Sequence, residues 1–165
     1  MKKALYAVIL ILCLAPLTTA QVEEGDKEVQ VQGSLIAFEG ITAIIGTFMY
    51  GYFVTPNTEI GGGPMIIYAS YEGEGESNIS LTLFGRYNFV SGEKVVPYLS
   101  GQIYQFDISP EEPMDFTDFT FLQVGGGFKY FVSDNLAYDV SGNLGFGLGG
   151  GDVSFILYGG LSAFF

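Results

Sequence analysis

The feature that most limits the fold of this chain is an alternation of apolar with small or polar side chains every two residues. In the segment LAYDVSGNLGFGL (136–148), Leu136 and Tyr138 share one parity, whereas Asp139 and Asn143 share the other. Successive side chains of a strand point to opposite faces of a sheet, so this pattern is typical of a strand with one apolar face. No stretch keeps an apolar period of 3.6 residues, and the chain is therefore predicted to be all-β.

Eight runs of this kind follow one another, and most end at a turn signal such as Thr-Pro-Asn or Ser-Asp-Asn. No low-complexity linker divides them, and the chain length suits one domain. The sequence predicts a single antiparallel, up-and-down sheet of eight strands. The runs span 28–38, 41–54, 58–71, 78–90, 95–108, 117–132, 136–148 and 153–165.

Three features of these runs favour a transmembrane β-barrel. The runs are long enough to cross about 25 Å of hydrocarbon when tilted, and an even strand number closes the sheet without an unpaired edge. The parity opposite the aliphatic side chains is mostly small or polar, as a narrow lumen requires. Aromatic side chains gather near the run ends and predict two interfacial girdles, formed by Tyr50, Tyr52, Phe53, Tyr87, Phe89, Phe128, Tyr130 and Phe131.

A soluble lipocalin-like barrel is the competing fold, because a water-soluble barrel also alternates. Its interior would have to hold the apolar parity that contains Leu81, Leu83, Leu144 and Phe146. The outer surface would then carry very few charges, which favours the membrane barrel over the soluble one.

The N-terminus has the pattern of a secretory signal peptide over residues 1–20. Lys2 and Lys3 precede the short apolar run ALYAVILILCLA, and small residues precede a predicted cleavage before Gln21. The barrel domain is then predicted to span 21–165. Cys13 is the only cysteine and the chain has no histidine, so the barrel domain has no disulfide framework and no thiolate metal site.

The balance of charge limits the partners. Without Lys2 and Lys3, only Lys27, Arg86, Lys94 and Lys129 stand against 18 acidic residues. Nucleic acid is excluded as a partner because its phosphates require a basic face. Direct binding of anionic lipid phosphates is also disfavoured, except through divalent cations.

Over essentially its whole length, the predicted barrel domain resembles small outer-membrane β-barrel proteins of the OmpA-transmembrane-like or OmpW-like kind, and its second half is the more specific part. The segments that carry the resemblance are PYLSGQIYQF (97–106), GGGFKYFVSDNLAYDVSGNLGFG (125–147) and the last run to Phe165. The resemblance implies a Gram-negative cell outer membrane as the location and outer-membrane lipids as partners. It also implies that the last strand and Phe165 are the signal read by the barrel-assembly machinery during insertion.

With the N-terminus in the periplasm, the turns at 55–57, 91–94 and 133–135 are expected to be periplasmic. The connections near 39–40, 72–77, 109–116 and 149–152 are then expected outside. Two of these connections are acidic, and their carboxylates are suitable ligands for Ca²⁺ or Mg²⁺, although the spacing is no EF-hand and a solvated acidic surface is the simpler interpretation. The acidic residues are Glu72, Glu74, Glu76, Glu111, Glu112, Asp115 and Asp118.

Polar residues on the inferred lumen parity are the candidate site. A narrow eight-stranded barrel is filled by side chains, and a buried charge must be paired. We therefore expect an ion-pair network that plugs the lumen, with a gate or narrow polar conduit as the alternative. Its predicted members are Arg86, Lys129, Asp139, Gln123 and Asn143, and Gln102, Glu39 and Glu59 are possible further partners.

No chemistry-bearing constellation is visible. Outer-membrane enzymes of this size are mainly lipid A acyltransferases and deacylases, whose chemistry relies on a histidine, and the chain has none. The segments GGGP (61–64) and GGGFK (125–129) open no helix and are expected to allow close packing or strand bending. The sequence thus predicts a non-enzymatic, cofactor-free protein of the cell envelope with a structural role. A small channel for ions or small hydrophobic solutes, and a surface binding module acting through the acidic loops, are the alternatives.

Overall fold

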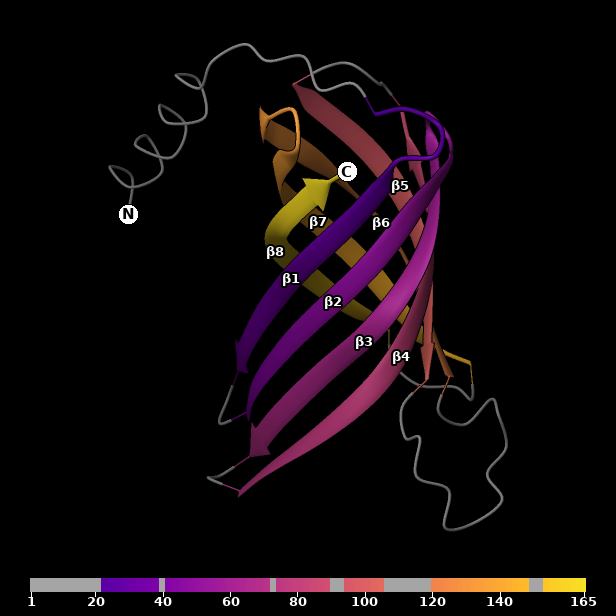
Figure 1. The fold of residues 1–165 in the computed structure, drawn as a ribbon. Coiled ribbons are helices and arrows are strands. Elements are labelled where there is room, and N and C mark those ends of the chain that lie inside the picture. The colour runs from indigo at the N-terminus through magenta and orange to yellow at the C-terminus, as the bar shows by residue number, and fades with distance from the viewer. Residues whose placement is uncertain (1–21, 39–40, 72–73, 90–93, 106–119, 149–152) are drawn as a thin grey trace.

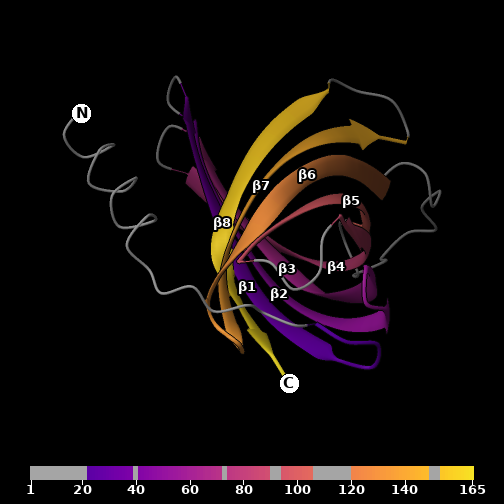
Figure 2. The ribbon, with the colours of Figure 1, turned by 90° about the horizontal axis from the view of Figure 1, so that it is seen from above.

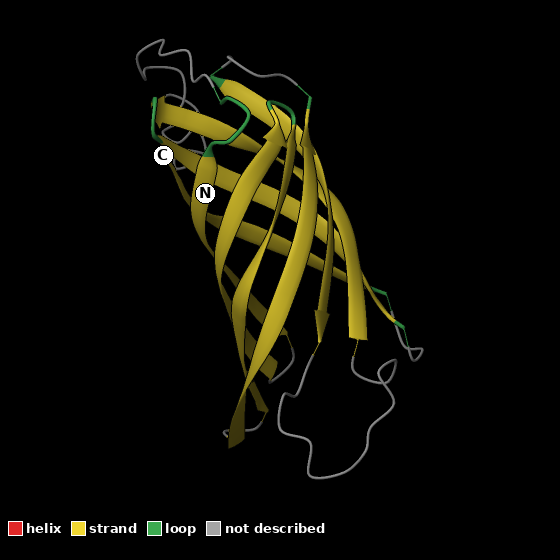
Figure 3. Cartoon of the chain, turned by 45° about the vertical axis from the view of Figure 1, so that its right-hand side comes forward, coloured by secondary structure: helices red, strands yellow, loops and turns green. Residues whose placement is uncertain are grey.

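The computed structural model describes residues 22–38, 41–71, 74–89, 94–105, 120–148 and 153–165. These residues form a closed barrel in which eight strands are joined in chain order by antiparallel pairing (Figures 1 and 3). The predicted eight-stranded antiparallel barrel is confirmed. The strands are β1 (Lys27–Phe38), β2 (Ile41–Thr55), β3 (Thr58–Tyr71), β4 (Glu74–Asn88), β5 (Val95–Gln105), β6 (Thr120–Ser133), β7 (Leu136–Gly147) and β8 (Ser154–Phe164).

Strand direction defines the two ends of the barrel. We call the end where β1 begins and β8 stops the near end, which lies at the top of Figure 1, and the opposite one the far end. Short turns close two of the hairpins at the near end. Between β2 and β3, the Thr55 hydroxyl accepts hydrogen bonds from the backbone N–H groups of Asn57 and Thr58, at 3.3 and 3.0 Å. Short turns favour polar residues such as Thr and Asn, because their side chains can form hydrogen bonds with the nearby backbone.

The predicted faces of the strands are observed. The apolar parity lies outside, where Leu83, Leu144 and Phe155 are exposed, and the small or polar parity lies inside. This arrangement is the reverse of that in a soluble barrel with an apolar interior. The parity of the fifth run, which the sequence left ambiguous, is settled because Val96, Tyr98 and Ser100 are buried whereas Val95, Pro97 and Leu99 are exposed.

The expected places of two girdle residues, Phe53 and Phe131, and the expected length of one connection are wrong. Phe53 and Phe131 do not lie at an interface, because both are on the inward parity and are buried in a cluster at the near end. Tyr130 has the outward parity but is buried, with the Lys94 ammonium 5.1 Å from its ring centroid. The connection expected at 72–77 is shorter, because β4 already begins at Glu74, which pairs with Tyr71.

The interior is layered along the barrel axis. At the near end lies an aromatic cluster, defined by Phe53, Val96, Phe131, Ala137 and Phe164. Charged and polar side chains follow, and a second apolar cluster fills the far end, defined by Ile45, Met65, Tyr104, Ile156 and Tyr158. Among the residues that the structure describes, no helix is long and apolar enough to cross a membrane.

Candidate functional site: a charged cluster in the lumen

Four buried charged side chains meet inside the barrel, and we call them the charged cluster: Glu28, Glu59, Arg86 and Lys129. Arg86 Nη1 lies 2.9 Å from Glu59 Oε2 and 3.4 Å from Glu28 Oε2. Lys129 Nζ lies 3.2 Å from Glu59 Oε2 and also bonds Glu28 Oε2. One oxygen of each carboxylate therefore contacts both cations. Each of the four charged groups thus has two partners of opposite charge.

Four different strands bring the charged cluster together. Glu28 comes from β1, Glu59 from β3, Arg86 from β4 and Lys129 from β6, so the cluster crosses the lumen. Glu59 and Arg86 are direct backbone partners in the β3–β4 ladder. Gly51 makes room for the cluster, because a Cβ atom at this position would collide with the Glu59 carboxylate. A larger residue at this position would therefore have to displace the Glu59 side chain from the charged cluster.

A hydrogen-bonded network around Asp139 lies beside the charged cluster. The Asp139 carboxylate accepts hydrogen bonds from Gln30 Nε2 and Gln32 Nε2, each at 2.8 Å, and from the Tyr98 hydroxyl at 2.7 Å. Gln30 joins the two groups, because its Oε1 accepts a bond from Arg86 Nη2 at 3.0 Å. Three neutral donors thus stabilise the carboxylate of Asp139, which forms no salt bridge with any of the described residues.

Aromatic rings enclose the cations of the charged cluster. The Lys129 ammonium lies 5.4 Å from the Phe53 ring centroid and 5.2 Å from that of Phe164, both members of the aromatic cluster. The Arg86 guanidinium lies 4.5 Å from the Tyr98 ring centroid. Such contacts stabilise a cation that has lost its hydration shell. The aromatic cluster therefore covers the charged cluster on its near-end side.

The structure brings some of the sequence-predicted site residues together and leaves others apart. Arg86 and Lys129 belong to the charged cluster, and Asp139 lies in the adjoining network. Gln123 and Asn143 are also buried inside, but Gln123 Nε2 donates to the Tyr104 and Tyr158 hydroxyls at 3.3 and 3.4 Å, nearer the far end. Asn143 Nδ2 donates to Ser141 Oγ at 3.5 Å. Gln102 is half-buried on the inward parity, and Glu39 lies outside the described residues.

Phe165 has an exposed ring at the near end. Its backbone N–H and C=O groups bond the C=O and N–H groups of Lys27, at 3.1 and 3.0 Å, and so extend the closure of the barrel. Its role as an assembly signal stays a prediction.

Several members of the interior network were missed from the sequence, although a signal was present. In the segment EVQVQ, Glu28, Gln30 and Gln32 share one parity and two valines share the other. This alternation marks the three polar residues as inward, as it did for Lys129. Tyr98 could not be assigned in the same way. Around Pro97, the residues of β5 are apolar or aromatic on both faces, so the sequence shows no alternation there.

Among the described residues, no group of three or more histidine, cysteine, aspartate or glutamate side chains is placed to hold a metal ion. The acidic residues proposed as cation ligands at 72, 111, 112, 115 and 118 lie outside the described residues. Glu76 lies within β4 and is exposed.

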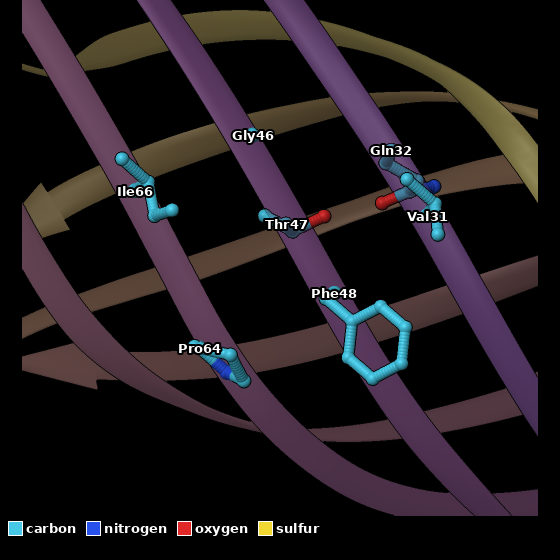
Figure 4. Close-up of a pocket in the computed structure, with 7 residues that line it drawn as sticks. All are labelled: Val31, Gln32, Gly46, Thr47, Phe48, Pro64 and Ile66. Atoms are coloured by element: carbon cyan, nitrogen blue, oxygen red, sulfur yellow. The ribbon is translucent and has the colours of Figure 1, made fainter.

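Two hollows mark the outer wall where glycines leave space between larger side chains. The first measures about 230 Å³ and lies over Gly46, next to Phe48, Pro64 and Ile66 (Figure 4). The second measures about 310 Å³ and lies over Gly85 and Gly101. Most residues that line the two hollows belong to the outward face.

Replacing Tyr98 by phenylalanine should lower the free energy of unfolding by about 1–3 kcal/mol, because Asp139 loses one of three buried donors. The ring and its contact with Arg86 are kept, so the change isolates the hydroxyl. Urea unfolding of the protein in lipid vesicles measures the effect. The matched control is Tyr138→Phe on the outward face of β7, where the side chain is exposed and almost no change is expected. Equal losses of unfolding free energy in the two variants would contradict a stabilising hydrogen bond from Tyr98 to Asp139.

Comparison with solved structures identifies the class of protein that has this fold. The N-terminal β-barrel domain of Pseudomonas aeruginosa OprF superposes with a TM-score of 0.60 and 20% sequence identity, covering 86% of this chain and 98% of that one. A de novo designed transmembrane β-barrel gives a TM-score of 0.56 and 15% identity, covering 88% and 99%. The fold is that of a small transmembrane β-barrel.

Within that class, the similarity to the OprF barrel domain supports the OmpA-like part of the resemblance, at the level of the fold alone. The two structures do not test the OmpW-like alternative, which stays a prediction. No protein-family model matches the chain, and the search of curated proteins found no match.

Proposed function

We propose that this chain is a non-enzymatic, integral outer-membrane protein of a Gram-negative cell, with a structural role in the envelope and a lumen closed by side chains. The fold shared with transmembrane barrels supports the membrane location, as does the predicted signal peptide at 1–20. The exposed apolar side chains of the outward parity supply the surface that outer-membrane lipids would cover.

The single observation that carries the closed lumen is the charged cluster with its aromatic cover. The four charged side chains come from β1, β3, β4 and β6 and are at most 2% exposed. An ion that passed through the barrel would have to separate these pairs and displace buried phenylalanine rings. Separating buried ion pairs costs several kcal/mol, which favours a plug over a conduit.

Recording in planar lipid bilayers tests this function. The purified full-length protein should give the same current as a protein-free bilayer, at both polarities and at high salt. Stable current steps would contradict the plug and favour the small channel, above all if Lys129→Gln changed their ion selectivity. The exposed Lys27→Gln is the control for a general effect of charge, since Lys27 lies outside the cluster.

A further inference from the structure

The seam between β1 and β8 is paired over only part of its length. Register partners run from Glu28 with Phe164 to Gly33 with Gly159 and then stop. On its other side, β1 stays paired with β2 as far as Phe38 and Ile41, and β8 stays paired with β7 as far as Ser154 and Gly145. In Figure 2, which looks at the barrel from above, β1 and β8 diverge toward the far end.

The two parted segments, 34–38 of β1 and 154–158 of β8, therefore each have one backbone edge without a strand partner in the described structure. Their sequences, SLIAF and SFILY, hold no charged residue. On the outward face, Leu35 and Leu157 are 71% and 61% exposed, and Phe155 is 63% exposed. These edges thus belong to the apolar outer surface that faces the hydrocarbon of the membrane. No water is present there to bind free N–H and C=O groups.

An unpaired edge in hydrocarbon needs another backbone as its partner, because acyl chains offer no hydrogen bonds. We propose that the partner is the same seam of a second copy of this chain. A two-fold axis along the membrane normal would set β1 of one copy against β8 of the other, and β8 of the first against β1 of the second. Both new pairs are antiparallel, as β1 and β8 already are within one chain.

The sequences of the two edges fit this pairing. If the register of Gly33 with Gly159 continues between copies, Leu35 faces Leu157 of the second copy on the outward side. Ile36 and Ile156 then face each other on the inward side, next to the apolar cluster at the far end. The surface is therefore self-complementary, and a single symmetric contact satisfies four edges. The inference does not depend on whether the lumen is closed.

Single-cysteine variants distinguish pairing between copies from closure within one chain. In a Cys13→Ser background, Leu35→Cys and Leu157→Cys are made as separate proteins, mixed, inserted into lipid vesicles and oxidised. Residues that face each other across an antiparallel pair are close enough for a disulfide. The mixture should form a disulfide-linked dimer on a non-reducing gel, which neither protein forms alone.

The control pair is Val31→Cys and Leu161→Cys, which are register partners within one chain. Together in one chain they should form an internal disulfide, and as a mixture they should give no dimer. If Leu35→Cys and Leu157→Cys form an internal disulfide when combined in one chain and no dimer as a mixture, the seam closes on itself and the proposal is overturned. Absence of any disulfide would overturn it as well. The unmodified protein gives an independent readout, because its mass in mild detergent should be that of a dimer and not of a monomer.

Discussion

Replacing Arg86 by methionine should lower the free energy of unfolding by about 3–5 kcal/mol. The substitution leaves two buried carboxylates, Glu28 and Glu59, facing the single ammonium of Lys129. It also removes the donor to Gln30 Oε1. An unpaired charge in this environment has no water to stabilise it, so the loss comes mainly from the partners left behind. Urea titration in lipid vesicles, with the folded fraction read from gel mobility, measures the change.

A double variant separates the loss of a pair from a general loss of packing. In Arg86→Met with Glu59→Met, one charge of each sign is removed, and the pair of Glu28 with Lys129 remains. We expect this variant to be more stable than Arg86→Met alone, with a coupling of about 1–3 kcal/mol between the two positions. Lys27→Met, at an exposed position, should change stability by about 0.5 kcal/mol or less. A loss below about 1 kcal/mol for Arg86→Met would show that the charged cluster does not hold the barrel together.

Phe131→Ala should also lower the free energy of unfolding by about 3–5 kcal/mol, because it opens a cavity in the aromatic cluster. Phe131 is fully buried, and its ring centroid lies 4.9 Å from that of Phe164. Phe164 in turn packs on Phe53, with 6.3 Å between the ring centroids. Removal of the Phe131 ring therefore loosens the cover over Lys129 as well as the cluster itself. The same urea titration measures this effect.

The matched control for Phe131 is Phe128→Ala on the same strand. Phe128 is exposed on the outward face, so lipid chains fill the space that its ring leaves and no cavity forms. Its loss should be clearly smaller than that of Phe131→Ala. If the two variants lose the same stability, the aromatic cluster is not a packed plug, and the burial of Phe131 has no structural consequence.

Strand parity predicted the fold and most of the interior, because a period of two is a property of the backbone. Lys129 and Asp139 lie inside as their parity indicated, and they are register partners in the β6–β7 ladder. The wrong prediction for Phe53 and Phe131 also shows that parity decides which face a residue occupies. Their place near the run ends suggested an interfacial girdle, but their parity is that of the lumen, and the structure follows the parity.

The pairing partners inside the lumen could not be predicted from parity alone. Parity gives the face of a residue, whereas the contact of Glu28 with Lys129 depends on strand tilt and on the stagger between β1 and β6. The contact between Gly51 and the Glu59 side chain is a second such case, because the close approach at Gly51 appears only when the carboxylate has been placed. The parted seam between β1 and β8 is a third, since both edges have the sequence of ordinary paired strands.

The account depends most on which parity faces lipid, and tryptophan fluorescence measures this directly. The chain has no tryptophan, so Phe48→Trp and Phe84→Trp each introduce one reporter, the first at an exposed position and the second at a buried one. Vesicles of phospholipids with brominated acyl chains quench a tryptophan that contacts them. We predict strong quenching of Phe48→Trp and much weaker quenching of Phe84→Trp. The opposite order would contradict the account, because the apolar parity would then form the inside of a soluble barrel.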